Sequence, residues 1–186
     1  MKKVLLVLTA LTFIMNVNAQ NIQLNENKIY EKKVVEKVDS VVAGELYLRA
    51  LEALSDWVGV DGKSSYGIDH QDKESGTIIF KGKDYLGYRN FVLGAFWSVW
   101  SEFTLKIRCK DGRAQIVVSI PSLWLEYSAN ATAKTSVALS EITPEYTFNA
   151  YRCKKACLQY INSVPESADR IITIVKEKLH QEVDNF

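Results

Sequence analysis

The feature that most constrains the fold is a pair of alternating segments joined by Asp111-Gly112. Each segment carries apolar residues at every second position, namely Phe103, Leu105, Ile107 and Cys109, then Ala114, Ile116, Val118 and Ile120. A period of two indicates a strand with one buried face. Because Asp-Gly is a strong signal for a tight hairpin turn, residues 103–120 are predicted to form two antiparallel strands. Pro121 marks the end of the second strand or a bulge in it.

The flanking segments predict the rest of a small mixed domain. Residues 32–40, 66–71 and 77–81 read as strands, and residues 45–58 carry a helical apolar stripe. Ser167 is expected to cap a last helix with apolar residues at Ile172, Val175 and Leu179. The order β-α-β-β-β-β-α predicts an α+β domain, an antiparallel sheet of about five strands with helices packed on one face. Residues 126–166 remain a variable excursion with one short helix near 151–162.

Three stretches carry a family resemblance. They are the Gly-Glu-Leu-Tyr-Leu-Arg-Ala segment at 44–50 leading to Trp57, the segment 69–81 around Asp-Lys-Glu-Ser-Gly-Thr-Ile, and residues 103–113 ending in Lys-Asp-Gly-Arg. In this order they resemble a family of exported bacterial proteins described as a domain of unknown function with a TATA-binding-protein-like (TBP-like) fold. The resemblance spans roughly residues 34–123. It implies the fold only, since the family has no established activity and no catalytic residues to transfer.

The N-terminus has the three parts of a secretory signal. Lys2 and Lys3 precede a run without charge, and Val17-Asn18-Ala19 forms a small-residue exit. We therefore expect residues 1–19 to be a signal peptide, cut between Ala19 and Gln20. The apolar run is shorter than the roughly 20 residues that span a bilayer. The expected mature protein has a loose segment at 20–30 and a single domain at 31–186. It lies in the periplasm or at the cell surface and has no transmembrane segment.

The charge of the chain predicts that its partner is not a nucleic acid. The formal net charge is +1, and loss of Lys2 and Lys3 with the signal peptide makes it −1. Domains that bind nucleic acids usually carry a strongly basic surface that neutralises phosphates. We therefore expect the ligand or partner to be of another class.

An aromatic stretch supplies the candidate binding residues. Seven rings fall between positions 85 and 103, and Gly82, Gly87 and Gly94 interrupt the stretch. The glycines favour a loop or an irregular edge in which some rings stay exposed. Large rigid rings are effective contacts for sugars and for proteins. The candidate ligand-binding residues are Tyr85, Tyr88, Trp97 and Trp100, and the alternative is that these rings pack the core.

Other reactive side chains form no recognisable catalytic or metal motif. His70 lies next to Asp69, but adjacent strand residues point to opposite faces. Glu177 and His180 share a helix face without the second motif that a dinuclear metal site needs. We predict no catalytic residue, no metal and no cofactor.

The three cysteines leave two readings open. Cys153 and Cys157 are four positions apart and lack a second zinc half-site. Either all three thiols, with Cys109, are free and buried, or one pair is bridged. A link from Cys109 to either of the others is easier to form than a bridge within a regular helix.

These observations favour a non-enzymatic binding or interaction module with an unknown envelope ligand or protein partner. The first alternative is a hydrolase or isomerase of an envelope polymer whose site forms only in three dimensions. The second is an assembly component that pairs through an edge of its sheet.

Overall fold

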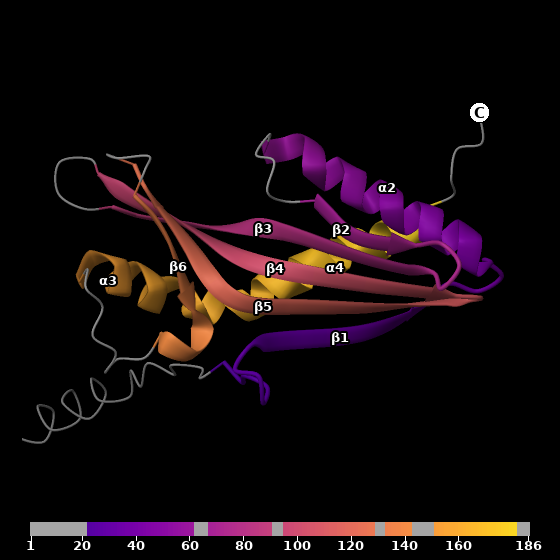
Figure 1. The fold of residues 1–186 in the computed structure, drawn as a ribbon, viewed down its shortest axis with the longest axis horizontal. Helices are drawn as coiled ribbons and strands as arrows, with labels where there is room; N and C mark the ends of the chain where they lie inside the picture. Colours follow the sequence, from indigo (N-terminus) through magenta and orange to yellow (C-terminus); the bar gives the residue numbers. More distant parts are fainter. Residues whose placement is uncertain (1–21, 62–66, 91–94, 129–132, 143–150, 182–186) are drawn as a thin grey trace, which may run out of the picture.

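The computed structural model describes residues 22–61, 67–90, 95–128, 133–142 and 151–181. The strands are β1 (Tyr30–Lys37), β2 (Gly67–Asp72), β3 (Thr77–Asn90), β4 (Phe96–Lys110), β5 (Arg113–Tyr127) and β6 (Lys134–Ala138). The helices are α2 (Ala43–Asp61), α3 (Tyr151–Tyr160) and α4 (Val164–His180), with short 3-10 turns η2 (Leu139–Glu141) and η3 (Ile161–Ser163) (Figure 1).

All strand pairs are antiparallel, and the sheet has the order β1-β5-β4-β3-β2. The strands β1 and β6 pair with successive parts of β5. Residues 113–120 of β5 pair with β1, and residues 122–126 pair with β6. The long β3, β4 and β5 form the middle of the sheet and run its whole length (Figure 1). The predicted α+β class, with its antiparallel sheet and TBP-like arrangement, is confirmed.

The predicted central hairpin is confirmed at residue level. Cys109 pairs with Ala114 and Ile107 with Ile116, all of them buried. Gly112 has a φ of +71°, a conformation that glycine adopts without steric cost. Pro121 lies at a bulge rather than at the end of β5. Thr104 pairs with Ser119 but Glu102 with Ser122, so β5 holds one extra residue there and then continues.

Residues 85–90 and 96–103 of the aromatic stretch belong to the continuous strands β3 and β4, so the predicted loop or irregular edge is wrong for these residues. Two of its glycines lie where a neighbouring aromatic side chain leaves no room for a Cβ. A Cβ on Gly82 would lie 2.6 Å from the ring of Phe103. Gly87 has a φ of +142° beside a bulge at Leu86, and a Cβ there would lie 2.5 Å from the hydroxyl of Tyr160. Gly94 lies outside the described residues.

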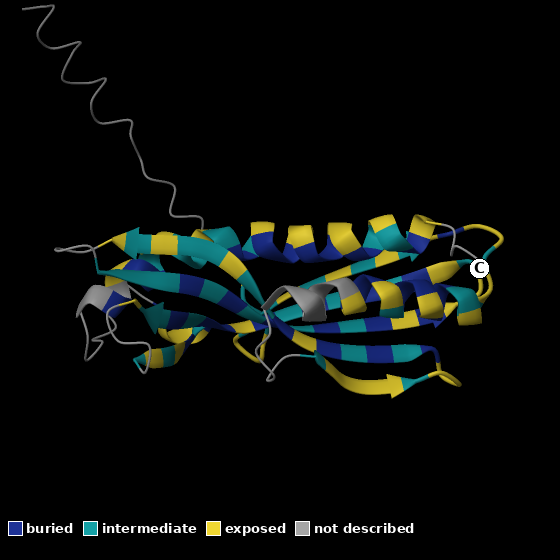
Figure 2. Ribbon diagram, turned by 90° about the horizontal axis from the view of Figure 1, so that it is seen from above, coloured by how far each residue is buried: buried dark blue, intermediate teal, exposed yellow. Residues whose placement is uncertain are grey.

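The described helices pack on one face of the sheet. In α4 the buried residues lie on the side toward the sheet and the exposed residues on the other (Figure 2). Helix α2 lies beside α4, and the buried Arg49 donates a hydrogen bond from Nη1 to the carbonyl of Leu179 at 2.8 Å. Helix α3 covers the far end of the same face. There Tyr160 donates to the carbonyl of Tyr88 at 2.7 Å.

Helix α4 begins earlier than predicted, and Ser167 does not cap it. The helix starts at Val164 with Pro165 in its first turn, where the missing N–H of proline costs nothing. Ser167 is fully buried and joins the helix to the sheet. Its hydroxyl lies 2.7 Å from that of Ser101 and donates to Oδ2 of Asp84 at 2.6 Å. The local sequence predicts a cap at Ser167, because its actual partners, Ser101 and Asp84, are distant in the chain.

The segment 126–166 is largely built into the domain. It holds the end of β5, β6, η2, α3, η3 and the start of α4. The short helix expected near 151–162 corresponds to α3.

Candidate functional site on the open face of the sheet

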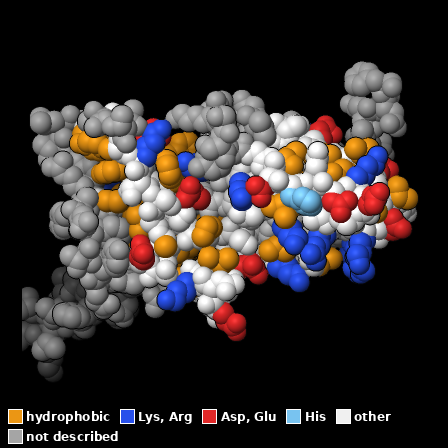
Figure 3. Space-filling view, in the orientation of Figure 1, with side chains coloured by type: hydrophobic (Ala, Val, Ile, Leu, Met, Phe, Trp, Pro, Cys, Tyr) orange, Lys and Arg blue, Asp and Glu red, His pale blue; other side chains and the backbone are white. Residues whose placement is uncertain are grey.

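The sheet face opposite the helices is covered by none of the described helices, and we call it the open face. Figure 3 shows this face, with hydrophobic side chains over much of it and, over one half, a group of Lys and Arg side chains with Asp and Glu side chains beside them. Residues that pair directly across strands share a face. The strand registers therefore fix which side chains stand together there.

Three aromatic residues on adjacent strands form the aromatic row, namely Tyr85, Trp100 and Trp124. Trp100 of β4 pairs directly with Tyr85 of β3 on one side and with Trp124 of β5 on the other. The rings of Tyr85 and Trp100 lie 4.7 Å apart between centroids. Tyr85 is 45% exposed and the two tryptophans are half-buried. Partial burial raises the pKa of Tyr85, so its hydroxyl is protonated at neutral pH.

Polar groups border the aromatic row. The ammonium of Lys83 lies 3.4 Å from the ring centroid of Trp124, a cation–π contact. Oε2 of Glu102 accepts hydrogen bonds from the hydroxyls of Ser122 and Ser136, each at 2.6 Å. The row thus combines aromatic surface with fixed donors and acceptors, which is the composition of a site for an amphipathic ligand.

The structure separates the four predicted site residues. Tyr85 and Trp100 stand together in the aromatic row. Tyr88 is also on the open face, 52% exposed, with its ring 5.6 Å from that of Phe96. Trp97 lies on the opposite face, packed against the core and 5.1 Å from the ring of Tyr127. It therefore does not belong to the row.

Trp124 is the member of the row that sequence reasoning did not include. It follows Pro121, where the strand was expected to end or bulge, so its face was not assigned. If the alternation of faces is continued along β5 with one extra residue at the bulge, Leu123 and Leu125 face the core, where they are buried. Trp124 then lies on the other face of the sheet. Continuing the alternation through the bulge was therefore the sequence signal that could have placed Trp124 on the open face.

The reactive residues considered in the sequence have structural partners. His70 is exposed on β2, while Asp69 pairs with Lys81 at 3.1 Å. His180 lies 2.9 Å from Glu36 of β1. Hydrogen bonds from Lys176 and then His180 hold the pKa of Glu36 below its usual value, because both donors favour the carboxylate. Within the described ranges no three His, Cys, Asp or Glu side chains gather as a metal site.

All three cysteines are free and buried. Burial raises the pKa of Cys109 to about 11, so the thiolate is scarce at neutral pH. A hydrogen bond with Cys153, followed by burial, raises the pKa of Cys157. The same hydrogen bond lowers the pKa of Cys153. Burial nevertheless limits the access of reagents to all three thiols.

Two predictions concern residues at the N-terminus. The expected cleavage site at Ala19 and Gln20 lies outside the described residues. In the described part of the chain, no helix is long and apolar enough to cross a membrane.

Known structures share this architecture. A DUF4468 family protein from Bacteroides ovatus is 13% identical, with a TM-score of 0.62 over 89% of this chain and 94% of that chain. A TBP-like protein from Parabacteroides distasonis is 16% identical, with a TM-score of 0.54 over 86% of this chain and 97% of that chain. At such identities the likeness shows the fold alone.

Comparison with curated proteins gives no match. The profile of the family described as a domain of unknown function (DUF4468) with TBP-like fold matches residues 30–123. This match agrees with the three stretches that carried the resemblance in the sequence. The chain therefore belongs to the DUF4468 family.

Proposed function

We propose that this protein is an exported, non-enzymatic binding module that holds a saccharide chain on the aromatic row of its open face. The observation that carries the proposal is the direct cross-strand alignment of Tyr85, Trp100 and Trp124 on a face that no described helix covers. Aromatic rings offer rigid apolar area to the C–H faces of sugars at low entropic cost.

The surroundings of the row favour a sugar over a protein partner. The centres of protein interfaces are depleted of charged residues. Here Lys83 lies against the ring of Trp124, and Glu102 is two pairs along from Trp100 and Trp124, which makes it the next residue of β4 on the same face. Charged and hydroxyl groups next to rings match the alternating hydroxyls and C–H faces of a saccharide.

Two alternatives find less support in these side chains. The described residues that line the cavity on the open face are Val35, Arg108, Lys110, Arg113 and Gln115, and none of them carries the carboxylate or imidazole that most often acts as a general base. This weakens the case for a hydrolase or isomerase. Edge strand β1 carries lysines and glutamates along its length, a composition typical of edges protected from pairing. This weakens the case for assembly through that edge.

The binding proposal is tested by affinity electrophoresis in gels that contain a panel of soluble neutral and acidic polysaccharides. We expect wild-type protein to be retarded by at least one of them. The double variant Trp100→Ala/Trp124→Ala should lose at least tenfold in affinity because the contact area is removed. A matched control, Leu48→Ala/Ile174→Ala, removes two exposed apolar side chains from α2 and α4 and should bind like wild type.

A third variant separates binding from folding. Trp97→Ala on the helix-covered face should lower the unfolding free energy, toward the lower end of about 3–5 kcal/mol, and leave binding intact. Retention of affinity by the Trp100→Ala/Trp124→Ala protein would refute the proposal. So would failure of every polysaccharide to retard the wild-type protein.

Export forms the other part of the proposal and rests on Lys2, Lys3 and the Val17-Asn18-Ala19 exit. Intact-mass measurement of protein recovered outside the cytoplasm should give a chain that begins at Gln20. Recovery of a chain that retains residues 1–19 would contradict it.

A further inference from the structure

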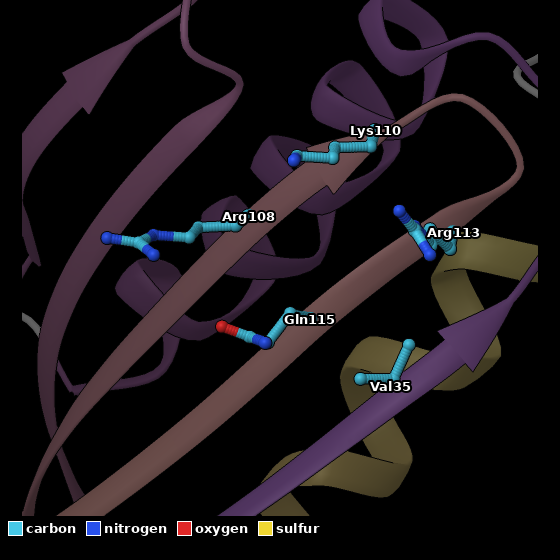
Figure 4. A pocket seen from close by; sticks show the side chains of 5 residues that line it. All are labelled: Val35, Arg108, Lys110, Arg113 and Gln115. Atoms are coloured by element: carbon cyan, nitrogen blue, oxygen red, sulfur yellow. The ribbon is translucent and has the colours of Figure 1, made fainter.

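The half of the open face away from the aromatic row contains a cationic concavity. Arg108 and Lys110 of β4, Arg113 and Gln115 of β5 and Val35 of β1 line a cavity of about 300 Å³. Figure 4 shows these five side chains rising from three adjacent strands. The cavity lies next to the turn that joins β4 to β5, and it opens on the same face as the aromatic row.

The sequence places like charges directly beside one another at this end of the sheet. Arg113 pairs with Lys37 of β1 on one side and with Lys110 of β4 on the other, so one row holds three cations on adjacent strands. Like charges directly opposite each other in a sheet are destabilising. An anion bound from outside the fold would relieve this repulsion and stabilise the arrangement.

Two aspartates near the cavity, Asp111 and Asp72, already accept hydrogen bonds from backbone N–H groups. Oδ1 of Asp111 accepts a hydrogen bond from the backbone N–H of Ala43 at 2.8 Å. Oδ1 of Asp72 accepts from the backbone N–H groups of Glu74 and Ser75 at 3.0 and 3.3 Å. Among the described residues, none of the three cations that line the cavity forms an ion pair with an acid.

We infer that the cavity binds the acidic groups of an anionic polysaccharide whose sugar rings also contact the aromatic row. The inference rests on the proposed saccharide-binding function and names the class of ligand. Guanidinium groups bind carboxylates and sulfates through paired hydrogen bonds, which gives geometry as well as charge complementarity.

The distance between the two sites selects an extended ligand. Trp100 and Arg108 lie on the same strand and the same face, about 27 Å apart at roughly 3.4 Å per residue. A single sugar or a free anion reaches one site only. A polymer that carries both sugar rings and regularly spaced acids reaches both.

The test measures affinity for polygalacturonate and heparin, with dextran as a neutral polymer and poly-L-glutamate as an acidic polymer without sugars. Wild-type protein should bind at least one of the acidic polysaccharides, and raising NaCl from 50 to 500 mM should weaken that binding at least tenfold. The variant Arg108→Gln/Arg113→Gln should lose at least tenfold in affinity at low salt. Its thermal midpoint should equal or exceed that of wild type, because like-charge repulsion is relieved.

The control Lys28→Gln/Lys73→Gln removes the same charge from exposed positions that do not line the cavity, and it should stay within twofold of wild type. Equal losses in the control and in the arginine variant would overturn the inference, since they would indicate attraction by overall charge. Equal binding of poly-L-glutamate would overturn the polysaccharide assignment.

The two proposals fail in different ways. If the Trp100→Ala/Trp124→Ala protein loses affinity while Arg108→Gln/Arg113→Gln does not, the aromatic row acts alone and the inference about the cavity is wrong. If only the arginine variant loses affinity, the cavity acts alone and the proposed role of the aromatic row is wrong. Loss in both variants supports both.

Discussion

Trp97 and Trp100 lie three positions apart on β4, so they point to opposite faces of the sheet. One packs under α3 against Tyr127, and the other stands in the aromatic row. The same parity separates Ile107, which is fully buried, from Lys106 and Arg108 on the open face. Single positions along a strand thus decide which side chains a ligand can reach.

The thiols give a prediction at the scale of single residues. Cys109, Cys153 and Cys157 are buried, and burial raises the pKa of Cys109 to about 11. Because all three thiols are shielded from solvent, we expect the native protein to react very slowly with an aromatic disulfide reagent at pH 7.5. In denaturant all three should react. Recovery of a single reactive thiol from the denatured protein would instead indicate a bridged pair.

At the scale of elements, β4 and β5 are the sheet strands that pair on both sides along their length. Their helix-facing residues form the centre of the core beneath α2 and α4. Their other face carries the aromatic row and the cationic cavity. The same two strands therefore hold the fold together and present the proposed ligand sites.

A pair of substitutions tests this division of faces. Ile107→Ala should lower the unfolding free energy by about 2–5 kcal/mol, since it leaves a cavity in a fully buried site. Ile79→Ala makes the same chemical change on the open face of β3, where the side chain is only partly buried. It should cost clearly less. Denaturant titrations of both variants measure the difference, and equal losses would mean that the two faces are equally buried.

The elements with a clean period were predictable, and those shaped by tertiary contacts were not. The alternation around Asp111-Gly112 and the helical stripes were sufficient to predict the central hairpin, α2 and α4. The sequence did not predict the extension of β3 to Asn90, because Gly82 and Gly87 interrupt the strand pattern. These positions are glycine because the side chains of Phe103 and Tyr160 come too close to leave room for a Cβ. Local propensity treats such glycines as breakers. Contacts with a neighbouring strand at Gly82 and with α3 at Gly87 explain them.

The candidate site was predictable only in part, for the same reason. Aromatic density pointed to the correct stretch, and Tyr85 and Trp100 do stand together. Trp124 lies in another strand, brought to Trp100 by a register that contains a bulge. The cationic cavity also depends on register, because Arg113 meets both Lys37 and Lys110 only once the three strands pair. The net charge of the chain carries no information about that clustering.

At the scale of the whole molecule, the fold divides into a helix-covered face and an open face. All the described helices lie on one side, as Figures 1 and 2 show. By strand register, the open face carries the aromatic row at one end of β4 and the cationic cavity at the other, and Figure 3 shows the group of Lys and Arg side chains on this face, with Asp and Glu side chains beside it. The proposed binding of an extended anionic polysaccharide rests on this local clustering of cations and not on the formal net charge of the chain, which is +1.

The most direct test of the open face as the binding surface is an NMR titration of ¹⁵N-labelled protein with oligogalacturonate. Shift changes should concentrate on β3, β4 and β5, and the indole N–H signals of Trp100 and Trp124 should move. The indole of Trp97 and the amides of α4 lie on the other face and should stay in place. Changes centred on α2 and α4, or no change at saturating oligogalacturonate, would contradict the account.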